Sequence, residues 1–149
     1  MKKVNIKIIL LFVALFAVAW YFFSNKINPQ NQQNEITSEF QTQENNEGLI
    51  KIKVVPKSSL NQEESQWKFE VILDSHALEI MNDMSKDSVL VDDKGNVYRS
   101  ITWEGDAPGG HHREGILVFD SIAPKPNSIT LQIKNVGDVE NRDFSWKID

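Results

Sequence analysis

The residue types best suited to chemistry in this chain gather between Trp103 and Phe119, in the stretch WEGDAPGGHHREGILVF. His111, His112 and Arg113 stand side by side there, directly after two glycines. Histidine is the commonest side-chain ligand for zinc and copper, and His76 is the third histidine of the chain. One hypothesis is therefore a copper or zinc site in which His76 shares an ion with His111 or His112.

The spacing of the two adjacent histidines leaves a second interpretation open. Neighbouring residues of extended backbone point to opposite faces, so His111 and His112 seldom bind one ion together. Carboxylates from Asp74, Asp106 or Glu104 would have to complete the site. In the alternative, one histidine hydrogen-bonds a backbone carbonyl beneath the loop and the other is exposed to solvent. This alternative needs no ligand.

The same residues do not assemble into catalytic machinery. A general acid–base pair could be drawn from His112 and Glu104. The chain has no cysteine, however, and no serine in a G-x-S-x-G setting, so no nucleophile is evident. We therefore expect a protein that is not an enzyme. Arg113, Glu104 and Asp106 are candidates for ligand binding, with Arg113 either anchoring a partner or pairing with a neighbouring carboxylate.

The segments that would position these residues alternate between apolar and polar side chains, as strands do. Seven such runs are separated by turn signals, and the turn DDKGN (residues 92–96) predicts a hairpin. The connection across the histidines, Glu104 to Glu114, spans 11 residues. HALEIMNDMSKD (residues 76–87) predicts a short helix or an irregular crossover. The runs are LIKIKVV, WKFEVIL, SVLV, NVYRSITW, GILVFDSI, SITLQIKNV and DFSWKI, and together they predict an all-β, antiparallel β-sandwich of about seven strands.

A membrane segment is expected at the N-terminus, over residues 1–23. Three lysines precede an unbroken apolar run of 16 residues, Ile8 to Phe23. Trp20 and Tyr21 lie near the end of this run, where aromatic rings suit a membrane–water interface. We therefore predict an uncleaved helix that contacts the lipid bilayer and anchors the chain.

Cleavage of the same segment is the alternative. Ala17 to Ala19 supplies an A-x-A pattern of the kind that signal peptidases recognise, although bulky aromatic residues follow it at once. Because the positive charge lies before the apolar run, the N-terminus is expected in the cytoplasm and the rest of the chain outside it. Both interpretations place the later domain in the extracytoplasmic space, and the first makes the chain a single-pass protein of the cell membrane.

Composition divides the exported part in two. Residues 24–48 are rich in Asn, Gln and Glu, which predicts a disordered linker. Residues 49–149 form the expected β-sandwich domain and carry 12 basic and 17 acidic residues without a basic stripe. This balance argues against binding to nucleic acid. The absence of cysteine excludes disulfides and a lipoprotein anchor.

The whole domain resembles a family of exported bacterial and archaeal domains of unassigned function. The resemblance rests on a W-x-G pattern followed by G-G-H-H-R-x-G-x-L-x-F, matched by Trp103, Gly105 and the run from Gly109 to Phe119. It implies an immunoglobulin-like sandwich and brings no activity, substrate or cofactor. We therefore expect a membrane-tethered binding or accessory domain of the cell envelope, whose partner is an unidentified protein or ligand.

Overall fold

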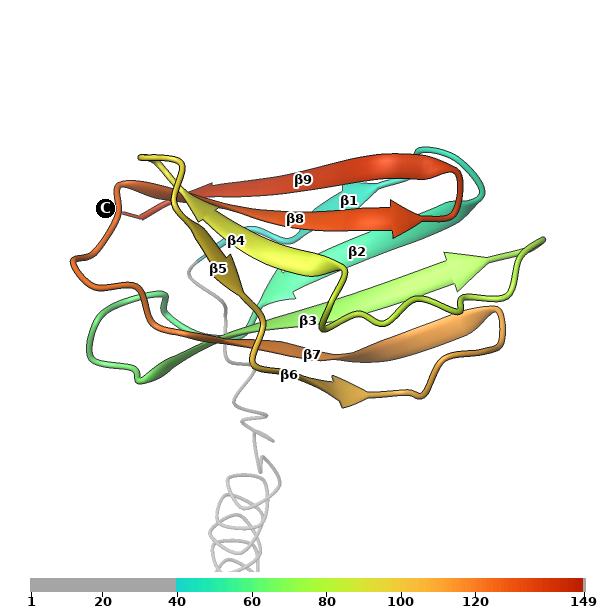
Figure 1. The fold of residues 1–149 in the computed structure, drawn as a ribbon, viewed down its shortest axis with the longest axis horizontal. Helices are drawn as coiled ribbons and strands as arrows, with labels where there is room; N and C mark the ends of the chain where they lie inside the picture. Colours follow the sequence, from blue (N-terminus) through green and yellow to red (C-terminus); the bar gives the residue numbers. More distant parts are fainter. Residues whose placement is uncertain (1–39, 149) are drawn as a thin grey trace, which may run out of the picture. The chain divides into compact units, whose positions relative to one another are not determined.

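In a computed structural model of the chain, the structure describes residues 40–148. These residues form two antiparallel sheets that face each other (Figure 1). The five-stranded sheet has the order β1-β2-β3-β7-β6, and the four-stranded sheet has the order β5-β4-β8-β9. The prediction of an all-β fold is confirmed. The strands are β1 (Gln43–Asn45), β2 (Ile50–Pro56), β3 (Gln66–Ser75), β4 (Ser88–Asp92), β5 (Val97–Arg99), β6 (Thr102–Gly105), β7 (His112–Asp120), β8 (Ser128–Val136) and β9 (Val139–Lys147).

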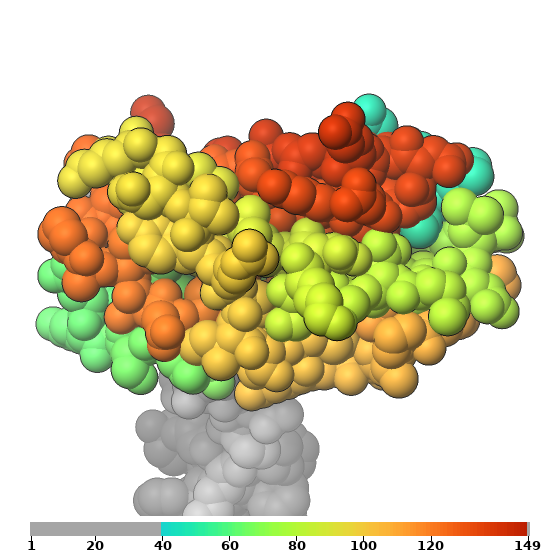
Figure 2. All heavy atoms as spheres, viewed as in Figure 1, coloured from blue at the N-terminus to red at the C-terminus, as the bar shows by residue number. Residues whose placement is uncertain are grey.

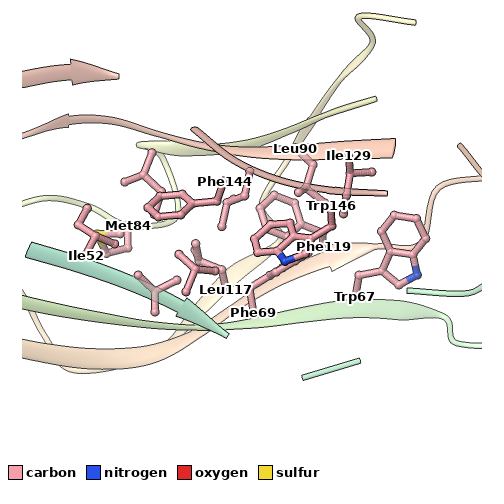
Figure 3. Close-up of a cluster of buried hydrophobic side chains, with 14 of the residues drawn as sticks. Ile52, Trp67, Phe69, Met84, Leu90, Leu117, Phe119, Ile129, Phe144 and Trp146 are labelled. Carbon is pink, nitrogen blue, oxygen red and sulfur yellow. The ribbon is translucent and has the colours of Figure 1, made fainter. Parts of the chain in front are cut away.

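The alternation seen in the sequence places one face of each sheet in the core. On β3, Trp67, Phe69 and Leu73 are fully buried, because every second residue points toward the opposite sheet. Figure 3 shows Phe69 and Phe119 from one sheet packed against Trp146 from the other. The rings of Phe69 and Phe119 meet edge to face, with 5.9 Å between their centroids. The domain is therefore held by an aromatic and aliphatic core, without disulfides.

The structure has nine strands instead of the expected seven because one run is divided and a further strand precedes the first. The run NVYRSITW becomes β5 and β6, which belong to different sheets. The chain changes sheets at Ser100 and Ile101, where the Ile101 amide donates to the Val118 carbonyl and the Ser100 hydroxyl bonds the same oxygen. Alternation alone does not reveal such a crossing, since the apolar pattern continues through it.

The extra strand corrects the expected boundary of the linker. Residues 24–48 were predicted to be disordered, but β1 lies within this range and pairs with β2. Gln43 exchanges hydrogen bonds with the backbone of Ser145, and the Trp146 indole donates to the Gln41 carbonyl at 2.8 Å. Hydrogen bonds from side chains thus hold this segment against β9. A composition poor in apolar residues does not indicate such a strand.

The crossover between β3 and β4, residues 76–87, contains no helix. Figure 2 shows this segment, in yellow-green, between the red strands β8 and β9 and the orange β6–β7 hairpin. The side chains of Ile80 and Met84, which belong to this segment, are buried, so the crossover contributes to the core. The backbone amide and carbonyl of Ile80 bond to the β6–β7 loop. In a helix these groups would bond within the segment itself.

The predicted membrane anchor, including Ile8, Trp20, Tyr21 and Phe23, lies outside the described residues. Most of the predicted linker lies outside them as well. Residues 40–148 contain no helix whose length and apolar character would let it span a bilayer.

Candidate functional site

The connection between β6 and β7 is shorter than the 11 residues expected from the sequence. Strand β6 ends at Gly105 and β7 begins at His112, which leaves six residues, Asp106 to His111. His112 and the residues after it continue the ladder with β3, where His112 lies opposite Asp74. The glycines and charged residues near the loop obscured this extension of the strand.

The two glycines of the motif bind the crossover through their backbone. The Ile80 amide donates to the Gly110 carbonyl at 2.8 Å, and the Gly109 amide donates to the Ile80 carbonyl at 2.9 Å. Gly109 and Gly110 have φ angles of 127° and 73°, which favour glycine over any residue with a side chain. The loop therefore forms a short ladder with Ile80, and the glycines permit the turn that this ladder needs.

His111 extends the same set of contacts. Its ring Nδ1 lies 3.0 Å from the Leu78 carbonyl oxygen, and its own carbonyl accepts the Ser75 amide at 2.7 Å. Both bonds join the loop to the beginning of the crossover. The contacts of His111 are those of a residue that holds the backbone in place.

Arg113 was expected in an exposed loop, and this expectation is wrong. The side chain is 1 % exposed, because its position on β7 opposite Leu73 directs it to the core face. Nη1 donates to the carbonyls of Ile80 and Asn82, and Nη2 donates to the Asp106 carbonyl at 3.0 Å. Burial lowers the pKa of Arg113 from its usual value. A guanidinium bonded to three carbonyls from two loops is a structural element and is not available as an anchor for a partner.

Trp103 covers a close approach of two glycines beside this arginine. Gly105 and Gly115 face each other across β6 and β7, and a Cβ on Gly105 would lie 2.4 Å from the Gly115 Cα. The indole fills the space that side chains would occupy there and donates to the Asp106 carbonyl at 2.9 Å. The Arg113 guanidinium carbon lies 5.9 Å from the centre of its ring. Trp103 is half-buried at the edge of the core and holds the end of β6 in place.

His112 is exposed on the outer side of the five-stranded sheet. Its Nδ1 lies 2.6 Å from Asp74 Oδ1, and its Nε2 lies 3.8 Å from Glu114 Oε2. The hydrogen bond to Asp74 raises the pKa of His112 above its usual value, with the carboxylates of Glu114 and Asp106 adding to the rise. The pair joins β3 to β7 at this end of the sheet.

The raised pKa gives a testable pH dependence. Because the folded-state pKa of His112 lies above that of the unfolded chain, the stability it contributes is complete below about pH 6.5 and is lost as pH rises through the folded-state pKa. The replacement Asp74→Asn is expected to lower the His112 pKa, as followed by NMR titration of the imidazole in the full chain. Asp143→Asn on β9 is the matched control. A native pKa at or below the usual value would contradict this assignment.

Acidic side chains surround a shallow hollow on the same outer face. The hollow is floored by Gly105, Gly115 and Ile116. Glu104 lies opposite Ile116 across β6 and β7, and Glu70 lies opposite Ile116 across β3 and β7, so the three form one row. Lys57 pairs with Glu70 at 3.0 Å. The carboxylates around the hollow are Glu70, Glu104, Asp106 and Glu114.

The three histidines do not form one cluster. His76 is exposed at the start of the crossover, His111 bonds Leu78, and His112 bonds Asp74. Among residues 40–148, no group of three or more His, Asp, Glu or Cys side chains is arranged to hold a metal ion. The copper or zinc hypothesis therefore gains no support from the geometry.

Two of the residues around the hollow, Glu70 and Glu114, were not among the candidate ligand-binding residues predicted from the sequence. Each alternates with core residues on its strand, so each had to face outward once β3 and β7 were paired. The pairing register was the missing information, since Glu70 and Glu114 are 44 positions apart in the chain. The expected ligand candidates Glu104 and Asp106 do belong to this surface, whereas Arg113 does not.

Comparisons with family models, curated proteins and solved structures found no match to this chain. The resemblance drawn from the Trp103–Phe119 motif stays a prediction.

Proposed function

We propose that this protein is a membrane-tethered, extracytoplasmic binding or accessory domain without enzymatic activity. Its binding surface is the outer face of the five-stranded sheet at the β6–β7 end. The observation that carries this proposal is the acidic hollow around Gly105 and Gly115, which residues of β3, β6 and β7 form. The N-terminal segment anchors the chain with its N-terminus in the cytoplasm, and residues after it hold the domain outside.

The order of the strands supports an immunoglobulin-like sandwich within this proposal. Strands β2-β3-β7-β6 and β4-β8-β9 follow the ABED and CFG arrangement of that fold, and β5 adds an edge strand beside β4. Domains of this architecture present loops and sheet faces on a rigid core. The fold supplies a scaffold, and the surface chemistry decides what binds.

The rigidity of the hollow supports its role in binding. Hydrogen bonds from Trp103 and Arg113 converge on the Asp106 carbonyl, and the Glu114 amide donates to the Asp106 carboxylate at 2.9 Å. The end of β6 is thereby fixed before any partner arrives. A preorganised surface binds with a smaller entropy cost than a mobile one.

Site-specific photo-cross-linking in the native cell tests the proposal. A cross-linking amino acid at Glu104 places the probe at the rim of the hollow, and one at Asp143 on β9 places it on the other sheet as a matched control. We expect a discrete adduct with an envelope component from position 104 and none from position 143. Equal labelling from both positions, or none from either, would count against a binding surface at the hollow.

A further inference from the structure

Strand β6 presents a free edge beside the acidic surface. Within residues 40–148, β6 pairs with β7 alone and ends the five-stranded sheet. The Asp106 amide donates to the Glu114 carbonyl, which makes Asp106 and Glu114 a hydrogen-bonded pair. Because such pairs alternate along an antiparallel ladder, the backbone groups of Trp103 and Gly105 point away from β7. They form a template for another strand.

Two of the other edges in the described part, those of β1 and β9, contact each other. β1 and β9 lie beside each other, and the Gln43 side chain bonds both the amide and the carbonyl of Ser145. This contact occupies backbone groups that an added strand would need. The remaining edge strand, β5, has three residues and carries Arg99 but no acidic residue. β6 combines free backbone groups with the four carboxylates around the hollow, whereas the one acidic residue of β1, Glu44, pairs with Lys51.

The negative charge at the edge of β6 favours a positively charged partner. Glu104 and Asp106 are exposed, and Glu70 and Glu114 stand behind them on the same face. A strand added to β6 would place alternate side chains next to Glu104 and Asp106, where positive charges are favoured and negative charges are not. Two copies of this chain joined through β6 would bring these carboxylates together, which disfavours self-pairing.

We propose that β6 binds an extended, lysine- or arginine-rich segment of a partner protein by strand addition. Backbone hydrogen bonds to Trp103 and Gly105 hold the segment, and its alternate basic side chains lie over the acidic hollow. This inference rests on the proposed binding function and assigns that function a partner chemistry and a mode of binding. No covalent step is involved.

Peptide titrations followed by amide chemical shifts of the full chain in detergent micelles test the inference. The probe is a short capped peptide in which lysine alternates with valine, and a glutamate–valine peptide is its control. We expect the largest shifts at the Trp103 and Gly105 amides with the basic peptide and none with the acidic one. Shifts confined to the four-stranded sheet, or no binding of the basic peptide, would overturn the inference.

Backbone methylation of the peptide separates strand addition from simple charge attraction. Only one edge of an added strand bonds β6, so N-methylation of one alternate set of amides should abolish binding and methylation of the other set should leave it unchanged. If both methylated peptides bind like the parent, strand addition is wrong while the acidic hollow remains a binding surface. The cross-linking experiment at position 104 judges the proposed function independently.

Charge reversal on the protein supplies the matched variants. Glu104→Lys combined with Glu114→Lys should lower the affinity for the basic peptide at least about tenfold, because attractive contacts at the rim of the hollow become repulsive. Glu140→Lys combined with Asp143→Lys changes the net charge equally at β9 and should leave the affinity unchanged apart from a small long-range effect. An equal loss in both pairs would mean attraction to the whole domain and would overturn the specific site. Dimerisation of the chain through β6, detected by sedimentation, would also overturn it.

Discussion

Replacing Arg113 with alanine is expected to lower the free energy of unfolding by about 3–5 kcal/mol, as measured by urea denaturation of the full chain. The change removes the donor for three carbonyls, those of Ile80, Asn82 and Asp106. It also leaves a cavity beside Trp103. Because native domains have only about 5–15 kcal/mol of stability in total, this loss is a large fraction of it.

The conservative variant and a surface control give this prediction its specificity. Arg113→Lys keeps the charge but loses the planar fork of donors, so most of the loss should remain. Arg99→Ala removes an exposed arginine from β5 and should change stability by no more than about 0.5 kcal/mol. Equal effects of Arg113→Ala and Arg99→Ala would show that the buried contacts of Arg113 do not hold the crossover.

The replacement Arg142→Ala is expected to lower the free energy of unfolding by about 3 kcal/mol, because it also removes a buried guanidinium. Arg142 is 1 % exposed, and it donates to the carbonyls of Val136, Glu47 and Ile50 and to the Asn45 side chain. It thereby fastens the β1–β2 turn to the β8–β9 turn.

Loss of Arg142 should also release β1 selectively. Amide exchange in β1 should accelerate more than exchange in β7, since Arg142 contacts the first segment and not the second. Lys134→Ala, which removes an exposed cation from β8, should leave both the stability and the exchange pattern unchanged. A uniform acceleration across all strands would contradict a local role for Arg142 at β1.

These two arginines show where sequence reasoning about this chain succeeds and where it ends. Alternation identified the core faces of β2, β3 and β8 correctly, because burial on one face leaves a period of two in the sequence. Arg113 and Arg142 also follow this alternation, and both occupy core-facing positions. Arg113 was nevertheless considered as an anchor for a partner, and Arg142 was not considered, since the carbonyls that bind each of them come from loops distant in the sequence.

The candidate site was predictable in part for the same reason. The motif GGHHR was recognised as unusual, and Glu104 and Asp106, named from the sequence as candidates for ligand binding, line the acidic hollow. The main contacts of the motif lie within the domain, however. Gly109, Gly110 and His111 hydrogen-bond to the crossover and to the end of β3. Such geometry depends on the pairing of β3 with β7, and the spacing of residues along the chain does not encode that register.

Amide hydrogen exchange at Ile80 and Gly109 tests the central claim most directly, namely that the glycine–histidine–arginine motif holds the crossover against the sheet. The Ile80 amide donates to Gly110 and the Gly109 amide donates to Ile80. In the native chain, both amides should be protected nearly as well as those of β3 and β7, and Arg113→Ala should reduce their protection before that of the strands. Exchange of the Ile80 and Gly109 amides at the rate of an unstructured loop would contradict the account.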